Sequence, residues 1–229
     1  MAEDKKIETD ERGIPLKSTY PENVPIPVLY TGFTVVFGTV GFLLARYACY
    51  GRSPSVQDAA DSKMDLVAQY DLGWLYLGMF LVRLLQLPVG IVLGVQRKAS
   101  KIEVPDQHAY AVQGAQGSKL GYVLMESEGV LGKFNRAQRA LQNYHEQFPT
   151  IALQYILSSF VFPFDSFVCV IIWALSRCIQ AVGYVEGAKS RMKGGLPGII
   201  ALNVINGLVL LVAIKTLGAG GDKMVKSTM

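Results

Sequence analysis

The sequence predicts an all-α fold, a bundle of helices that crosses a membrane several times. The 229 residues are 51% hydrophobic and only 17% charged, which is little charge for a soluble domain. The mean hydropathy is positive, at +0.30. The apolar residues also gather in runs close to the roughly 20 that a helix needs to cross a bilayer. We therefore expect one polytopic helical membrane bundle.

The first span follows a polar segment. Residues 1–23 alternate in charge and contain no basic start with an apolar core, so we expect a polar tail and no cleaved targeting signal. The first membrane helix is expected at 24–49. Aspartates and turn formers then predict a polar connection, so residues 24–71 comprise one membrane helix and its link to the next.

The second span, at about 72–95, contains Arg83 near its middle. An arginine at this depth costs several kcal/mol unless it is paired or reaches the interface. Arg83 should therefore face the bundle interior or a polar partner. It could serve there as one member of a structural pair or as a residue of a functional site. A basic stretch ends the span, and residues 103–133 are expected to form a long loop.

A charged segment leads directly into the third span, which ends near residue 162. It covers residues 134–149 and reads FNRAQRALQNYHEQFP. At helical spacing Arg136, Arg139, Asn143 and Glu146 share one face. Because lipid offers such groups no partners, this face must meet other helices or a polar ligand.

Two further spans complete the predicted bundle. A tight turn is expected at 163–165, with Pro163 ending the previous helix and Asp165 capping the new one. The fourth span then runs to about residue 187, with Arg177 near its middle. The fifth covers 196–217, and residues 218–229 form a tail. Lysine and arginine predominate on the side that carries the N-terminus, which the positive-inside rule assigns to the cytosol.

Other classes of function have little support. The three cysteines, Cys49, Cys169 and Cys178, lie in or beside apolar runs without a metal-binding spacing, so no metal site is expected. His108 and His145 are single histidines without a second ligand nearby in sequence. A net charge of +4, without a basic face mixed with aromatics, is not typical of a nucleic-acid-binding protein.

Four segments, RAQRALQNYHEQFP, SRCI, QAVGYVEG and KSRMKGG, carry a resemblance to a known family. They resemble the membrane-associated proteins in eicosanoid and glutathione metabolism (MAPEG), most closely type-three microsomal glutathione transferases and leukotriene C synthase. The resemblance covers about residues 72–217. The family core has four helices, so the first span looks like an added one. The matched motif positions are Arg139, Ala140, Asn143, Glu146 and Pro149, followed by Gly183 and Tyr184.

The resemblance implies a homotrimer that binds glutathione between protomers near the cytosolic face. Glutathione has two carboxylates and an ammonium, which suit the guanidinium, amide and carboxylate of Arg139, Asn143 and Glu146. By similarity Arg191 would lie beside the glutathione thiol and favour the thiolate. The other expected glutathione contacts are Arg97, Arg177, Gln180 and Tyr184.

Each of these residues also has a structural interpretation. Arg139, Asn143 and Glu146 could form interhelical salt bridges instead of a ligand site. Arg177 could neutralise Glu146, and Tyr184 could be an interfacial aromatic. Arg191 could be an ordinary basic residue of the cytosolic side. Two departures from the relatives bear on catalysis: Gln180 stands where they usually have tyrosine or histidine, and Gln147 where leukotriene C synthase has tyrosine.

Two functions follow. The first is a membrane glutathione transferase or peroxidase that uses glutathione as co-substrate against a lipophilic electrophile or lipid hydroperoxide. The alternative is a catalytically weak or inactive MAPEG-fold subunit, structural or lipid-binding, of a larger membrane complex. In either case we expect membrane lipids as partners and a multi-pass protein of the endoplasmic reticulum or another organelle membrane, with a cytosolic N-terminus.

Overall fold

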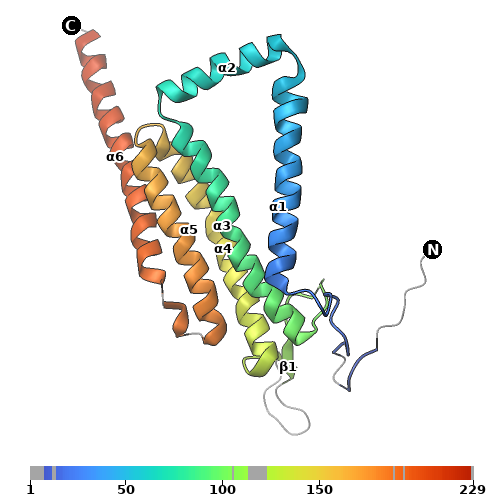
Figure 1. Ribbon diagram of the computed structural model, residues 1–229. Helices are drawn as coiled ribbons and strands as arrows, with labels where there is room; N and C mark the ends of the chain where they lie inside the picture. The colour runs from blue at the N-terminus through green and yellow to red at the C-terminus, as the bar shows by residue number, and fades with distance from the viewer. Residues whose placement is uncertain are drawn as a thin grey trace.

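The computed structural model describes residues 8–11, 14–104, 106–112, 123–187, 189–192 and 194–227. These residues form a helical bundle with one short β-hairpin (Figure 1). The helices are α1 (Ile26–Leu44), α2 (Pro54–Gln69), α3 (Gly73–Ser100), α4 (Gly129–Ser159), α5 (Pro163–Glu186) and α6 (Gly195–Ser227). The strands β1 (Tyr110–Val112) and β2 (Val123–Met125) pair antiparallel. The predicted all-α class is confirmed.

Four helices are long and apolar enough to cross a bilayer, namely Ile26–Arg52, Gly73–Ser100, Pro163–Glu186 and Gly195–Leu217. They match the first, second, fourth and fifth predicted spans. The first includes a π-helical turn, Ala45–Cys49, and a 3-10 turn, Tyr50–Arg52, which extend α1. Helix α4 has 31 residues, but its charged first half sets it apart from these four. Its second half is apolar, and there Ile151 and Tyr155 are fully buried.

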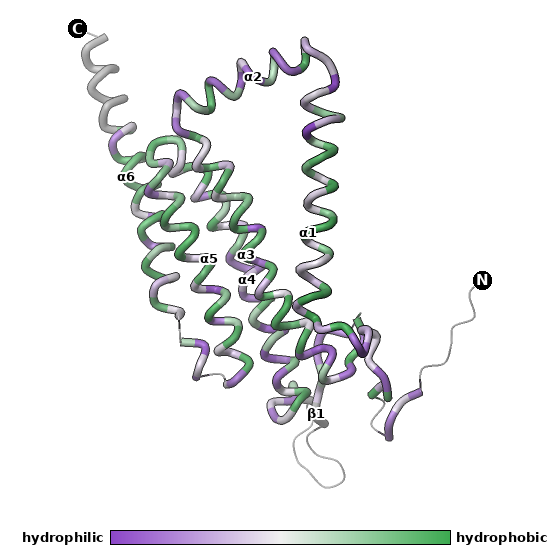
Figure 2. The backbone as a smooth tube through the Cα atoms, viewed as in Figure 1, coloured by the Kyte–Doolittle hydropathy of each residue, from purple (hydrophilic) through white to green (hydrophobic). Residues whose placement is uncertain are grey.

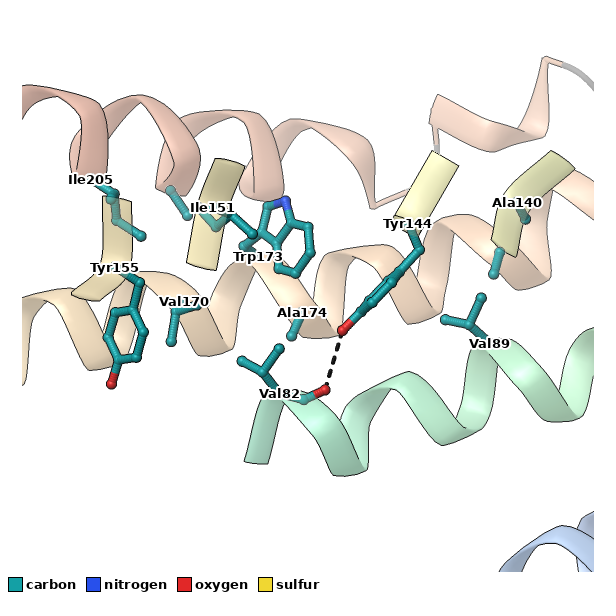
Figure 3. Close-up of a cluster of buried hydrophobic side chains, with 12 residues drawn as sticks. Val82, Val89, Ala140, Tyr144, Ile151, Tyr155, Val170, Trp173, Ala174 and Ile205 are labelled. Atoms are coloured by element: carbon teal, nitrogen blue, oxygen red, sulfur yellow. Dashed lines mark hydrogen bonds between the residues drawn. The ribbon is translucent and has the colours of Figure 1, made fainter. Parts of the chain in front are cut away.

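The hydrophobic core lies between α3, α4, α5 and α6 (Figure 3). Tyr144 of α4 and Trp173 of α5 pack with ring centroids 5.2 Å apart. The Tyr144 hydroxyl donates to the carbonyl oxygen of Val82 in α3 at 3.2 Å. Every residue of this buried cluster belongs to one of the four helices. The four-helix unit therefore has a core of its own.

Helix α1 contacts the bundle at one end and diverges from it toward the other (Figure 1). Within α1, Ile26 is the buried residue. Ile26 and Tyr30 pack on Gly90 and Gly94 of α3, where a Cβ at position 94 would come within 2.7 Å of Cγ2 of Ile26. Glycines four residues apart let membrane helices approach closely. This pair of glycines makes room for the first turns of α1.

The segment before α1 is fixed to the same end of α3. The ammonium group of Lys98 donates to three backbone carbonyl oxygens at 2.6, 3.0 and 3.0 Å, those of Pro21, Glu22 and Val24. The hydroxyls of Tyr20 and Tyr30 lie 3.1 Å apart. Part of the predicted polar tail is therefore held against the end of the bundle that the positive-inside rule predicts to be cytosolic.

The predicted polar connection contains a helix, α2, which the sequence interpretation missed. The Ser53 hydroxyl accepts a hydrogen bond from the Val56 amide at 3.3 Å and caps the helix, and Pro54 occupies its first turn. Hydrophilic and hydrophobic residues alternate along α2 (Figure 2). Three aspartates at helical spacing share one face, namely Asp58, Asp61 and Asp65. An amphipathic helix of this kind suits the membrane interface.

Several predicted boundaries are corrected by the structure. Helix α4 begins at Gly129, inside the predicted loop 103–133, and that loop also contains the β-hairpin; residues 113–122 lie outside the described residues. Pro163 starts α5, and α4 ends earlier, at Ser159. Proline suits a first turn because its missing N–H has no partner there anyway. Asp165 lies in this turn, but the N-cap is Phe162. The backbone of α6 stays helical to Ser227, within the predicted tail.

Candidate functional site

The polar face of α4 carries an accessible ion pair. Arg139 and Glu146, two helical turns apart, meet with a guanidinium nitrogen 3.1 Å from a carboxylate oxygen. Their side chains keep 42% and 50% of their exposed area. Asn143 lies between them on the same face. The three residues predicted to bind glutathione therefore present a cation, an amide and an anion on one open surface.

A shallow groove of about 410 Å³ adjoins this face. It is lined by the amide side chains of Gln107, Gln138 and Gln142, together with Leu141, His145 and Glu146. Gln107 comes from the segment between α3 and β1, and the other residues come from α4. Amide groups both donate and accept hydrogen bonds. The groove therefore offers neutral polar contacts beside the Glu146 carboxylate.

Asn135, near the start of α4, fixes the segment that contains β1 and β2. It is 6% exposed, and its amide nitrogen donates to the carbonyl oxygens of Ala109 and Glu126 at 2.7 and 2.8 Å. Its amide oxygen accepts from the Ala109 N–H at 2.8 Å. Asn135 thus joins the start of β1 to the end of β2. Sequence reasoning missed it because its partners lie next to strands of only three residues, which are too short to show a period.

Arg97, at the end of α3, points into the protein. It is 6% exposed, and one guanidinium nitrogen donates to the carbonyl oxygen of Asp106 at 2.7 Å and to that of Glu103. The guanidinium lies 4.9 Å from the ring centroid of Phe134. These contacts hold the segment between α3 and β1. A contact between Arg97 and glutathione stays a prediction.

Arg177 of α5 is buried in the bundle. Its guanidinium donates to Oε1 of Gln180 at 2.7 Å and lies 5.7 Å from the Trp173 ring centroid. Within this chain Glu146 is paired with Arg139, and the hydrogen bond of Arg177 goes to Gln180 instead. Gln180 therefore accepts the hydrogen bond of a buried arginine.

The structure brings Arg191 and Tyr184 together. Arg191 lies in the short turn Ser190–Met192 that follows α5, and its side chain is exposed. Its guanidinium lies 6.0 Å from the Tyr184 ring centroid. The aromatic face attracts the cation and limits the orientations of its side chain. An exposed guanidinium on a half-buried ring is free to meet an incoming anion.

The start of α4 and the end of α5 lie at the same end of the bundle (Figure 1). Arg136 connects the two helices, because its Nε donates to the carbonyl oxygen of Val185 at 3.1 Å. Within the described part of the chain, no hydrogen bond or ion pair joins Arg139, Asn143 or Glu146 to Arg177, Gln180, Tyr184 or Arg191. One chain thus presents two separate halves of the predicted site.

These features define a polytopic helical membrane protein with an arginine-bearing polar site at one end of its bundle. A family model described as the MAPEG family matches residues 75–213, which is more than half of the chain. The chain belongs to the MAPEG family. The matched range begins within α3 and ends within α6, so α1 and α2 lie outside it. A comparison with curated proteins found no match. Membership associates this membrane protein with glutathione or eicosanoid metabolism.

Proposed function

We propose that this protein is a membrane glutathione transferase or peroxidase that activates the glutathione thiol against a lipophilic electrophile or lipid hydroperoxide. The observation that carries the proposal is the open α4 face, where Arg139, Asn143 and Glu146 present matched groups for glutathione. Arg191 stands exposed in the turn Ser190–Met192 that follows α5. Membership of the MAPEG family supports this proposal.

Glutathione can compete for the groups of the α4 face. An exposed ion pair such as Arg139–Glu146 contributes at most about 1 kcal/mol. A glutathione carboxylate can therefore replace Glu146 on the Arg139 fork with a bidentate contact. The released Glu146 carboxylate then accepts hydrogen bonds from the glutathione ammonium, and Asn143 supplies a neutral donor and acceptor.

Arg191 would supply the catalytic cation. A thiol with a pKa of about 8.5 is mostly protonated at neutral pH, and an adjacent guanidinium stabilises the thiolate. In conjugation, the thiolate sulfur forms a bond to the electrophilic carbon. The bond that breaks at that carbon gives its electron pair to the leaving group, such as chloride, or to the oxygen of an opened epoxide, which then takes up a proton. In peroxide reduction, the sulfur takes the distal oxygen as the O–O bond breaks and leaves an alcohol, and a second glutathione then gives the disulfide and water.

The two halves of the site suggest how the protein assembles. We propose that glutathione lies between the α4 face of one protomer and the α5 face of its neighbour in a homotrimer, as in the family. The lipophilic substrate then arrives laterally from membrane lipid. An endoplasmic reticulum or other organelle membrane, with the N-terminus and this end of the bundle in the cytosol, would give access to cytosolic glutathione.

A non-enzymatic function is the second candidate. Arg97 is committed to backbone carbonyls and Gln180 to Arg177, which removes two predicted contacts from the open surface. Most of α1 is exposed along its apolar length, as expected for a helix that packs against another membrane protein. Under this alternative the chain is a structural or lipid-binding subunit of a larger complex.

Glutathione binding tests the proposed site. Isothermal titration of the purified protein in detergent should show binding, and Glu146→Gln should weaken it about tenfold, because a charge-assisted hydrogen bond to the ammonium is lost. The control Asp65→Asn removes an exposed carboxylate from α2 and should bind as the original protein does. Equal affinity in all three proteins would contradict the α4 site.

Turnover tests the catalytic role of Arg191. The protein should conjugate 1-chloro-2,4-dinitrobenzene or reduce a lipid hydroperoxide with glutathione, and Arg191→Ala should lower kcat by roughly tenfold or more because thiolate is no longer stabilised. Arg52→Ala removes an exposed arginine elsewhere and should have no effect. A folded protein that neither binds glutathione nor turns over, and that purifies in a larger assembly by native mass, would favour the non-enzymatic candidate.

A further inference from the structure

Helix α1 has an apolar face that no other described part of the chain covers. Its first turns pack on α3 through Ile26 and Tyr30. Beyond them α1 diverges from the bundle (Figure 1). Helix α2 has 16 residues and is therefore about 24 Å long, so it carries the end of α1 away from the start of α3. On the face turned away from Tyr30, which we call the outer α1 face, Val28, Val35 and Phe42 are 61%, 60% and 69% exposed.

The corner between α1 and α2 is held by specific contacts. The Tyr50 hydroxyl donates to Oδ1 of Asp61 at 2.7 Å and accepts from Nε2 of Gln57 at 3.1 Å. The Arg46 guanidinium lies 5.0 Å from the Tyr50 ring centroid. These contacts set the angle between the two helices. The divergence of α1 from α3 is therefore part of the fold.

Helix α6 also has an uncovered face, which we call the outer α6 face. Its exposed residues follow one another at alternating spacings of four and three, namely Leu196, Ile200, Asn203, Gly207, Leu210 and Ile214. A Cβ at Gly207 would meet no described atom within 4 Å. This spacing is typical of two helices that pack side by side over their length. The Asn203 amide donates to the carbonyl oxygen of Ile199 at 2.8 Å, and lipid offers its amide oxygen no donor, which favours a helical partner.

The two faces lie on opposite flanks of the bundle (Figure 1). Helix α1 contacts α3, whereas α6 contacts α5 and α4. Both helices begin at the predicted cytosolic end, so α1 of one copy and α6 of another run parallel in the same membrane. Two different faces on opposite flanks suit a head-to-tail contact between copies, which closes into a ring. The same arrangement would place the α4 face of one copy beside the α5 face of the next.

The charges at the other end of the bundle favour this pairing. Helix α2 carries Asp58, Asp61 and Asp65 against a single lysine, Lys63. Lys215 is the only charged residue of the last membrane span, and it is exposed near the end of that span. Helix α2 and this part of α6 lie at the same end of the molecule (Figure 1). An acidic helix on one flank and a lysine on the other attract each other between copies and orient the contact.

We propose that the outer α1 face packs against the outer α6 face of a second copy of this chain, so that each copy holds its neighbour in the membrane. Close packing of the two helices supplies most of the association. Thr39 shares the outer α1 face with Val35 and Phe42, and its hydroxyl can donate to the Asn203 amide oxygen. The contact lies outside the family match, because α1 precedes residue 75. It goes beyond the proposed function, since it needs a second copy and no glutathione.

Site-specific photo-crosslinking tests the contact. Copies of the full chain with two different tags would be expressed together, and only one would carry p-benzoylphenylalanine in place of Phe42. After illumination of the membranes, purification through the second tag should recover an adduct that joins α1 of one copy to α6 of the other. Phe37 lies on the Tyr30 face of α1 and is 64% exposed. The same probe at Phe37 should lose most of this adduct.

Two sets of variants test the surfaces. Gly207→Phe should lower the adduct yield about tenfold, because the new side chain prevents close approach of α1. Its own chain has room for it, so the melting temperature in detergent should not change. Gly73→Phe, at another open helical glycine, should leave the adduct unchanged. Lys215→Asp or Asp65→Lys alone should lower the yield roughly threefold, and the two together should restore it.

The outcomes separate this contact from its alternatives. An adduct of the Phe42 probe with lipid alone, with α3 or with another protein would overturn the proposal. So would equal yields from the probes at Phe42 and Phe37, or an unchanged yield in a folded Gly207→Phe protein. Absence of glutathione turnover together with an intact adduct would contradict the proposed function and support this contact, so the two failures are distinguishable.

Discussion

The arginines of this chain have different environments, and burial distinguishes their functions. Arg97 and Arg177 are 6% and 7% exposed and lie on aromatic rings with their hydrogen bonds directed at protein groups. Arg139 and Arg191 are accessible to solvent. In the sequence all four are arginines that the interpretation assigned to the glutathione site, so only the structure separates those that hold the fold from those that can meet a ligand.

At the residue scale, Asn135→Leu should destabilise the hairpin. The substitution removes three hydrogen bonds and leaves backbone groups of Ala109 and Glu126 without partners. We expect a loss of about 2 kcal/mol in the free energy of unfolding, measured by denaturation in detergent, with faster proteolysis between α3 and α4. Lys133→Leu introduces the same side chain at an exposed position of the same helix and should be neutral. Equal stability of the two variants would contradict this role of Asn135.

At the element scale, the predicted spans and the observed helices agree where hydropathy dominates. The apolar spans are set by their length, so they can be predicted from sequence. Helix α2 could not, because its aspartates outweigh a short apolar stripe in a window average. The packing of α1 on Gly90 and Gly94 does have a sequence signal, the spacing of two glycines by four residues in an apolar helix, which the sequence interpretation overlooked.

Gly94→Leu should therefore detach α1 from α3. A Cβ at this position already comes too close to Ile26, so the larger side chain should cost about 1 to 3 kcal/mol of packing. Spin labels in place of the exposed Phe33 and Val95 would report the separation of the helices. The distance distribution should broaden and shift to longer values.

The matched control is Gly38→Leu. A Cβ at Gly38 meets nothing within 4 Å, so the same substitution should leave the distance between the labels unchanged. An unchanged distribution in the Gly94 variant would show that contacts other than the glycine pair hold α1.

At the scale of the whole molecule, the candidate site was only partly predictable. The α4 face follows from helical spacing, so Arg139, Asn143 and Glu146 could be grouped from the sequence. Contacts between distant segments could not, such as Arg136 with Val185 or Gln86 with His145. They depend on how antiparallel helices align along their length, which a single sequence does not encode locally.

The four-helix unit should fold without the first two helices. Every residue of the buried cluster lies in α3 to α6, and the family match also begins within α3. Removal of residues 1–70 takes away the carbonyl partners of Lys98, but this residue lies at the end of the membrane span, where water can replace them. The shortened chain in detergent should melt within a few degrees of the full protein, since a loss of about 1 kcal/mol shifts Tm by roughly 2–4 °C at this size. It should also bind glutathione equally well.

The variant for comparison is Trp173→Ala in the full chain, which removes a fully buried side chain of the core. It should lower the free energy of unfolding by about 3 to 5 kcal/mol and therefore lower Tm much more than the deletion does. If the shortened chain instead melts lower than the Trp173 variant, α1 and α2 belong to the folding unit itself.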